Sequence, residues 1–311
     1  MYDALASLDS VKLNFSESSI LFLNITLALI MVGVALGVRL KRFKKVLLSP
    51  KSLVVGLISQ LILLPGLTFL ITIILKLPTS IALGMILVAS CPGGNISNFM
   101  TTLAKGNVEL SVTMTMFTTL GAAIFTPLNF AFWGKLFLNF ATNKYGVDLE
   151  PITINFFQML ETVVIILVIP IILGLIITRL WPKQSIKAGP YVRTISIVIF
   201  IILVIVMIFN NLKFVIDVVK LIFILVLLHN AVAILTGYFF GAANKLPKKD
   251  RKTLGIETGI QNSGLALVLI FTPNLFDGLG GMASIAAWWG IWHIISGLTL
   301  GFIWSKKKKY A

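Results

Sequence analysis

Apolar runs of about 20 residues recur along the 311-residue chain, and the lysines and arginines gather mainly in the short segments between them. A membrane-spanning helix needs about 20 apolar residues, because the hydrocarbon layer is about 30 Å thick and each helical residue rises about 1.5 Å. Only 12% of the residues are charged, about half the share that is usual in a soluble domain. The strands of a β-barrel would instead alternate polar and apolar residues. We therefore predict an all-α integral membrane protein.

We predict nine transmembrane helices, one for each apolar run. They are Ser19–Val38, Ser52–Leu75, Thr79–Ala104, Val108–Phe132, Ile152–Trp181, Tyr191–Phe209, Phe214–Gly241, Thr253–Pro273 and Met282–Trp304.

The basic residues favour one side of this arrangement. If the N-terminus lies outside, the inner segments and the span ends beside them hold 20 of the 26 lysines and arginines, and the outer segments and the span ends beside them hold 6. Short cytoplasmic loops carry such an excess in membrane proteins. We therefore expect a multi-pass protein of the plasma membrane (the inner membrane of a bacterium), with residues 1–18 as an extracellular tail and residues 305–311 as a cytoplasmic, lysine-rich tail. The net charge of +15 then reflects topology, and we expect no nucleic-acid partner.

Two of the predicted spans contain residues that interrupt helices. The third includes Cys91-Pro92-Gly93-Gly94-Asn95-Ile96-Ser97-Asn98, and the eighth includes Gly255-Ile256-Glu257-Thr258-Gly259-Ile260-Gln261-Asn262-Ser263-Gly264. Proline removes a backbone donor and glycine weakens helical order. Because unsatisfied backbone is costly in lipid, both breaks are expected to face protein or water inside the helix bundle.

The two interrupted spans also resemble each other. Lys76-Leu77-Pro78 precedes the first and Lys245-Leu246-Pro247 precedes the second. The two spans are five apart in order, so they cross the membrane in opposite directions. This predicts an inverted repeat of four plus five spans, a plan that is common among transporters, in which the two broken helices cross.

Glu257 is an acid near the middle of a predicted span, and no Lys or Arg is expected at its depth to pair with it. A carboxylate there either keeps a proton or holds a cation. Zinc or copper would favour His and Cys ligands, whereas the polar residues of these spans offer oxygen. We therefore predict a site for an alkali cation. The candidate oxygen donors are Gln60, Ser97, Asn98, Ser111, Thr115, Glu257 and Gln261.

The second half of each broken helix has a free N-terminus, which carries partial positive charge and unpaired N–H groups. We expect these half-helices to begin near Gly94–Asn95 and near Asn262–Ser263. Together they would form a cavity suited to a carboxylate or sulfonate, and His293 is a further candidate for its wall.

Three motifs resemble the bile acid:sodium symporter family over nearly the whole chain. They are Cys91-Pro92-Gly93-Gly94-x-x-Ser97-Asn98, Gly106-Asn107-x-x-Leu110-Ser111 and Glu257-x-Gly259-x-Gln261-Asn262-Ser263-Gly264. The resemblance implies a panel domain, built from the spans at residues 19–38, 152–181 and 191–209, and a core domain, built from residues 52–132 and 214–304. Bacterial members of the family have ten helices, so this chain resembles a version that lacks the first.

The resemblance also implies two sodium sites and a substrate cavity. Ser97, Asn98, Ser111, Thr115 and Glu257 match the first sodium site. The second matches Gln60, Glu257, Gln261 and the backbone carbonyls of Thr258 and Gly259. The substrate cavity would involve Gly94, Asn95, Asn262, Ser263 and His293. Asn95 stands where a bacterial relative has Thr, and Ile294 stands where it has Asn, which leaves the substrate open.

We therefore expect a monomeric secondary transporter, not an enzyme, that couples two Na⁺ ions to the uptake of an organic anion such as a bile acid or a pantoate-like acid. A sodium/proton antiporter with Glu257 as its titrating group is the alternative. A carrier of sugars or amines also stays open. An intramembrane protease is disfavoured, because no Asp lies clearly within a span and no Gly-x-Ser-x-Gly motif is present.

Overall fold

The computed structural model describes residues 5–9, 17–36, 50–145, 155–210, 212–276 and 279–306. Within these ranges the fold is helical, and an isolated β-bridge joins Gly93 to Gln261. The elements are η1 (Ser7–Asp9), α2 (Glu17–Leu36), α4 (Lys51–Ile58), the π-helical turn η2 (Ser59–Leu63), α5 (Leu64–Ile74), α6 (Thr79–Ser90), α7 (Ser97–Leu103), α8 (Val108–Tyr145), α9 (Phe156–Val163), the π-helical turn η3 (Val164–Val168), α10 (Ile169–Leu180), α11 (Pro182–Asn210), α12 (Leu212–Ala243), α13 (Lys248–Gly259), α14 (Ser263–Phe271) and α15 (Gly280–Lys306).

Six helical stretches in the described part of the chain are long and apolar enough to cross a membrane. They are Ser18–Leu36, Lys51–Ile74, Val108–Asn143, Phe156–Leu180, Val218–Ala243 and Gly280–Lys306. They fall on the first, second, fourth, fifth, seventh and ninth predicted spans. The third and eighth predicted spans are each divided into two short helices, and the sixth lies within α11. The prediction of an all-α membrane protein is confirmed, whereas the number of nine spans stays a prediction.

Two helices, α8 and α11, extend far beyond the apolar runs that predicted them. The prediction ended the fourth span at Phe132, but α8 continues to Tyr145. Phe137 and Ala141 are buried there, so packing against neighbouring helices holds the extension. The prediction began the sixth span at Tyr191, but α11 begins at Pro182 and includes Pro190. A scan for apolar runs finds the part of a helix that suits lipid and misses a polar end.

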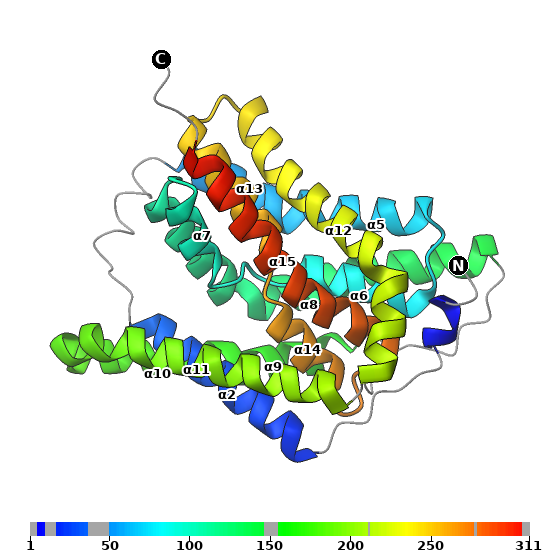
Figure 1. Ribbon diagram of the computed structural model, residues 1–311, viewed down its shortest axis with the longest axis horizontal. Helices are drawn as coiled ribbons and strands as arrows, with labels where there is room; N and C mark the ends of the chain where they lie inside the picture. Colours follow the sequence, from blue (N-terminus) through cyan, green and yellow to red (C-terminus); the bar gives the residue numbers. More distant parts are fainter. Residues whose placement is uncertain are drawn as a thin grey trace.

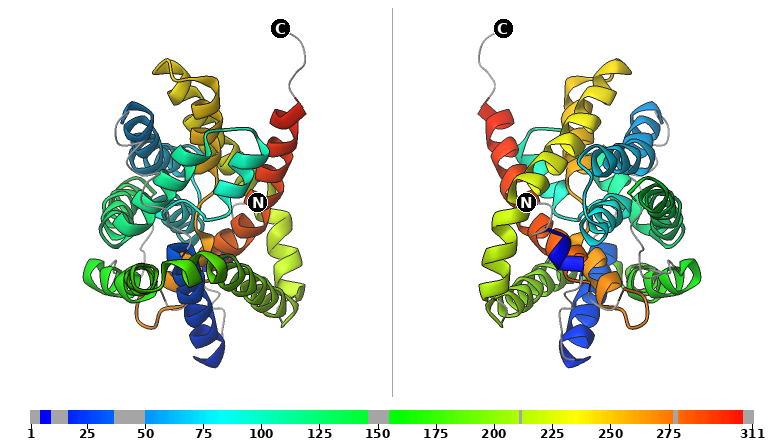
Figure 2. Two further views of the ribbon diagram at one scale, coloured as in Figure 1. Left: turned by 90° about the vertical axis from the view of Figure 1, so that its left-hand side faces the viewer. Right: turned by 90° about the vertical axis from the view of Figure 1, so that its right-hand side faces the viewer.

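The helices form two packed groups (Figures 1 and 2). In one group, α2 packs against both α10 and α11. In the other, α12 packs against α13 and α15, while α6 lies against α15 and α8. α14 belongs to the second group by its contact with α15 and also contacts α2, so it lies where the two groups meet.

The extracellular position of residues 1–18 stays a prediction, and residues 5–9 are packed against the helices. The turn η1 contacts α6 and α15, and the side chains of Leu5 and Leu8 are each 4% exposed. Their burial explains the contact, because two leucines withdrawn from water stabilise the attachment of an otherwise polar segment. The predicted cytoplasmic tail lies mostly outside the described residues, since α15 ends at Lys306.

The same turn precedes both interrupted helices. Lys76 and Lys245 have left-handed backbone angles (φ 50° and 57°), and in each turn the lysine and the leucine after it donate backbone hydrogen bonds to the last turn of the preceding helix. This is the Schellman geometry that ends a helix. The prolines that follow, Pro78 and Pro247, share φ −57° and have ψ 155° and 148°. The two similar tripeptides of the sequence therefore adopt similar structures.

The two breaks meet each other at the centre of the molecule. The Gly94 amide donates to the Ile260 carbonyl (2.7 Å) and the Asn262 amide donates to the Pro92 carbonyl (2.8 Å). This pairing satisfies backbone groups that lipid could not. It also corrects one prediction: α7 begins at Ser97, not at Gly94–Asn95. Gly94 instead belongs to the segment that pairs with the opposite break.

Candidate functional site

A cluster of oxygen atoms surrounds the carboxylate of Glu257, which is completely buried. Glu257 lies on α13, two residues before that helix ends at Gly259. Ser97 begins α7, and Ser111 and Thr115 lie one turn apart on α8. Ser97 Oγ donates to Glu257 Oε1 (2.6 Å), as does Ser111 Oγ, and Thr115 Oγ1 donates to Oε2 (2.9 Å). Four predicted ligands from three helices therefore lie together.

The cluster contains more oxygen–oxygen contacts than its hydroxyl protons can serve. Besides the three contacts to Glu257, Ser111 Oγ lies 2.9 Å from Asn98 Oδ1, Thr115 Oγ1 lies 3.0 Å from the Ser111 carbonyl, and Ser97 Oγ lies 3.4 Å from Thr115 Oγ1. Three hydroxyls supply one proton each. The remaining contacts bring acceptor oxygens together without a proton between them, and a cation among them would offset that repulsion.

A second group of polar side chains lies on the other side of Glu257. Gln60 is completely buried, and its Oε1 has no hydrogen-bond partner among the described residues. Gln60 Nε2 donates to Gln261 Oε1 (3.4 Å). A methyl group added at Gly93 would lie 3.0 Å from Gln60 Nε2 and 3.2 Å from Glu257 Oε2. Glycine thus lets the broken segment approach both side chains, and the unpaired Gln60 oxygen is available to a cation.

The π-helical turn Ser59–Leu63 positions Gln60. It ends just before Pro65, whose ring removes a backbone donor and crowds the preceding turn. Widening that turn accommodates the proline, and such π-bulges often occur at functional sites. Ser59 Oγ lies 3.0 Å from Thr258 Oγ1, so the widened turn is held against the end of α13. The sequence analysis did not predict this turn, although Pro65 lies beside it.

The two predicted carbonyl ligands already accept hydrogen bonds. Gln261 Nε2 donates to the Thr258 carbonyl (2.8 Å), and Asn230 Nδ2 donates to the Gly259 carbonyl (2.7 Å). A carbonyl oxygen has two lone pairs, so it can keep one such bond and still contact an ion. Asn230 in turn accepts from Ser296 Oγ (2.6 Å). Asn230 and Ser296 were missed, because a polar residue within an apolar run gives no sign of its partner.

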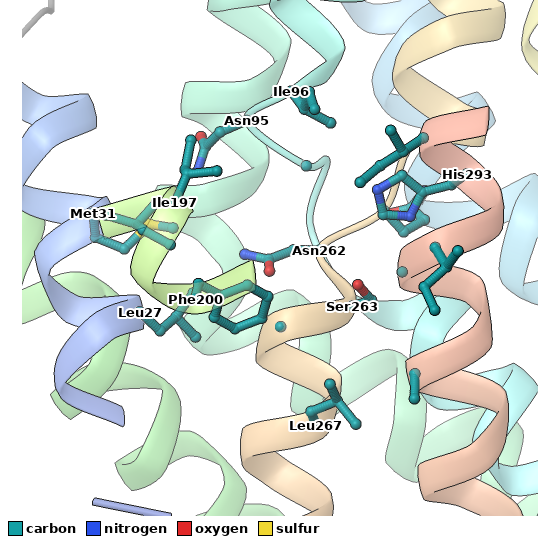
Figure 3. A pocket seen from close by; sticks show the side chains of 18 of the residues that line it. Leu27, Met31, Asn95, Ile96, Ile197, Phe200, Asn262, Ser263, Leu267 and His293 are labelled. Atoms are coloured by element: carbon teal, nitrogen blue, oxygen red, sulfur yellow. The ribbon is translucent and has the colours of Figure 1, made fainter. Parts of the chain in front are cut away.

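A cavity of about 480 Å³, termed the apolar cavity below, lies beside the paired breaks. Its wall is mostly apolar, with Leu27 and Met31 from α2, Ile197 and Phe200 from α11, and Leu267 from α14 (Figure 3). The predicted substrate residues Gly94, Asn95, Asn262, Ser263 and His293 all line it.

Both breaks contribute an asparagine to this cavity. Asn262 precedes α14 and caps it, because its Oδ1 accepts from the Leu265 amide (3.1 Å). Figure 3 shows its amide nitrogen directed into the space near Phe200 and Ile197. Asn95 Oδ1 is buried without a hydrogen-bond partner among the described residues. The cavity therefore combines an apolar wall with a few polar groups, the usual character of a small-molecule site.

Comparisons with known proteins identify the family of this chain. The model of the sodium bile acid symporter family matches residues 24–218. The uncharacterized sodium-dependent transporter YocS of Bacillus subtilis is 35% identical over 288 residues, which cover 93% of this chain and 84% of that protein.

Two relatives from eukaryotes are longer. The P3 protein of Homo sapiens is 30% identical over 272 residues (86% of this chain, 54% of that protein), and the probable chloroplastic sodium/metabolite cotransporter BASS2 of rice, Oryza sativa subsp. japonica, is 31% identical over 248 residues (78% and 55%). The chain thus spans about half the length of these two proteins. The match to the family model covers more than half of the chain, and so the chain belongs to the sodium bile acid symporter family, a family of sodium-dependent membrane transporters.

Proposed function

We propose that this protein couples the inward movement of Na⁺ to the uptake of an organic anion. The observation that supports this most strongly is the completely buried Glu257 carboxylate among Ser97, Ser111 and Thr115. Within the described part of the chain no Lys, Arg or His hydrogen-bonds to it. A buried carboxylate without a cationic side chain needs a cation or a proton, and oxygen ligands with a single negative charge suit a monovalent ion.

Two sodium ions would share Glu257 in this proposal. One would lie among Ser97, Asn98, Ser111 and Thr115, and the other among Gln60, Gln261 and the carbonyls of Thr258 and Gly259. Both groups include residues at or next to the paired breaks, which also line the apolar cavity. Sodium binding would therefore stabilise the cavity wall, and the substrate would raise the affinity for sodium by the same factor, because coupling between two binding sites is reciprocal.

Movement of the two helix groups against each other would alternate access to the cavity. In our proposal the panel comprises α2, α9, α10 and α11, and the core comprises the other spans. The similar turns at Lys76-Leu77-Pro78 and Lys245-Leu246-Pro247 support an inverted repeat within the core. Repeats of this kind give a transporter two related conformations, each open to one side of the membrane.

The proposal can be tested by transport into proteoliposomes. Uptake of labelled taurocholate and of pantoate is measured with an inward sodium gradient and with choline in place of sodium. With two Na⁺ per monoanion one net positive charge enters, so an inside-negative potential should accelerate uptake, driven by about 2.3 kcal/mol per 100 mV for each charge. Glu257→Ala should abolish sodium-dependent uptake, while the exposed Glu161 gives the control Glu161→Ala, which should transport normally. Normal uptake by Glu257→Ala at low sodium would refute the mechanism.

Sodium/proton antiport is the second candidate, because a buried carboxylate can be neutralised by a proton as well as by sodium. A pH-sensitive dye inside the same proteoliposomes separates the two. An antiporter would move protons when sodium is added without any organic anion. A symporter would show no such signal, and its sodium uptake would require the anion.

A further inference from the structure

A second cavity, of about 430 Å³, lies between the two helix groups and is termed the arginine cavity below. Its walls come from α2, α7, α8 and α11, and it is lined by Asn98 and Thr115 of the oxygen cluster and by Arg193 of α11. Ile197, one helical turn beyond Arg193, lines both this cavity and the apolar cavity. The two cavities are therefore neighbours along the same face of α11.

Arg193 is a partly buried cation that lacks an acidic partner. Its Nη2 donates to the backbone carbonyl of Asn95 (3.3 Å), and no carboxylate within the described residues forms an ion pair with it. A guanidinium has five N–H donors in a planar fork that matches a carboxylate or a sulfonate. A charged group withdrawn from water is costly unless it is paired. Arg193 thus offers a positive charge and unused donors to the cavity that it lines.

The backbone of α11 is fixed at this residue by a close contact with α2. A methyl group added at Gly33 would lie 2.7 Å from the Arg193 backbone nitrogen and 2.8 Å from its Cα, so the two helices touch here and only glycine fits. The guanidinium extends from this contact to the carbonyl of Asn95, in the break before α7. Arg193 consequently joins α2 and α11 to the broken segment that lines the apolar cavity.

We propose that Arg193 is the counter-ion for the acid group of the transported anion, and that this anion is amphipathic. Its apolar body would occupy the apolar cavity, and its carboxylate or sulfonate would reach Arg193 past Asn95 and Ile197. This inference rests on the proposed sodium symport. It adds that the acid group lies between two positive charges, since Asn98 and Thr115 of the first predicted sodium site line the same cavity as Arg193.

This placement predicts opposite effects of Arg193 on the two ligands. Without the anion, the guanidinium and a sodium ion in the first site repel each other; with the anion, both are attracted to it. Replacement of Arg193 by a neutral residue should therefore weaken anion binding and leave sodium binding unchanged or stronger. A residue that merely maintained the fold would weaken both.

The test uses the full-length protein in detergent and measures binding by calorimetry and by thermal unfolding in NaCl and in choline chloride at equal ionic strength. The probes are cholate, its neutral methyl ester and pantoate. Arg193→Gln should bind cholate about ten- to a hundredfold more weakly, the effect expected for loss of a hydrogen-bonded ion pair. Arg193→Lys should lie between it and the native protein. Arg179 is an exposed arginine on α10, and Arg179→Gln is the matched control, which should bind cholate normally.

The methyl ester and sodium provide the remaining readouts. The ester should bind the native protein and Arg193→Gln equally, and sodium alone should stabilise both. The inference is overturned if Arg193→Gln binds cholate as tightly as the native protein, if ester binding falls in parallel, or if the variant loses its response to sodium. It is also overturned if native protein with sodium binds pantoate but not cholate, or binds neither. A native protein that sodium does not stabilise refutes the symport proposal instead, and anion binding in choline still tests Arg193.

Discussion

Replacement of Glu257 by glutamine tests the proposed sodium sites most directly. The change keeps the size of the side chain and removes one negative charge from a completely buried position. At an effective dielectric constant of about 20, a charge 4 Å from a monovalent ion contributes about 4 kcal/mol. Its loss should weaken sodium binding about a thousandfold. Both proposed ions share this carboxylate, so neither site should retain appreciable affinity.

The effect on stability should depend on sodium. A ligand at a hundred times its dissociation constant stabilises the folded state by about 2.7 kcal/mol, and at a tenth of it by almost nothing. Sodium should therefore raise the unfolding temperature of the native protein and leave that of Glu257→Gln unchanged. In choline the variant should be as stable as the native protein or more stable, because it no longer buries an uncompensated charge. A residue that only supported the fold would destabilise the protein in both media.

The assay is thermal unfolding of the purified protein in detergent, with NaCl or choline chloride at constant ionic strength. Glu161→Gln, a change of the same kind at an exposed position of α9, is the control and should keep the full response to sodium. The reasoning is refuted if Glu257→Gln is stabilised by sodium as much as the native protein. It is refuted equally if the variant is less stable in choline by several kcal/mol.

Two further variants test the surroundings of this carboxylate. Gly93→Ala should still fold but should lower the apparent sodium affinity about tenfold in a thermal-shift titration. The new methyl group would lie 3.0 Å from Gln60 Nε2 and 3.2 Å from Glu257 Oε2 and would press on both. An unchanged titration would contradict the second sodium site. Asn230→Ala should lower the free energy of unfolding by about 1–3 kcal/mol in choline, the usual penalty for leaving a buried polar group unpaired. The loss should be smaller in sodium, because the ion can contact the Gly259 carbonyl. An equal loss in both media would remove that carbonyl from the set of sodium ligands.

The position of the breaks could be predicted from the sequence, because it follows from local chemistry. Pro92 and the neighbouring glycines cannot continue a helix, and the residues around Glu257 are too polar for a plain span. The convergence of Ser97, Ser111 and Thr115 on Glu257 was also expected, in this case from the resemblance to the family. The structure places those side chains within hydrogen-bond distance of the carboxylate.

Other features depend on contacts between distant segments, which one sequence does not specify. α7 begins two to three residues later than predicted, and Gly94 pairs with Ile260 of the other break. The bond from Asn230 to the Gly259 carbonyl joins α12 to the end of α13. Arg193 counted only as one more basic residue of an inner segment, since charge counting considers which side of the membrane a residue occupies and ignores the direction of its side chain.

The direction of the Arg193 side chain bears on how sodium and the proposed substrate would be coupled. Glu257 supplies one negative charge, whereas the two proposed sodium ions and Arg193 together would supply three positive charges. A state loaded with sodium alone would therefore be electrostatically unfavourable, and an anion beside Arg193 would reduce the excess. By reciprocity the sodium ions would increase the affinity for the anion. The same imbalance disfavours movement of sodium without substrate, so a single arginine on the panel would contribute both to recognition of the anion and to suppression of a sodium leak.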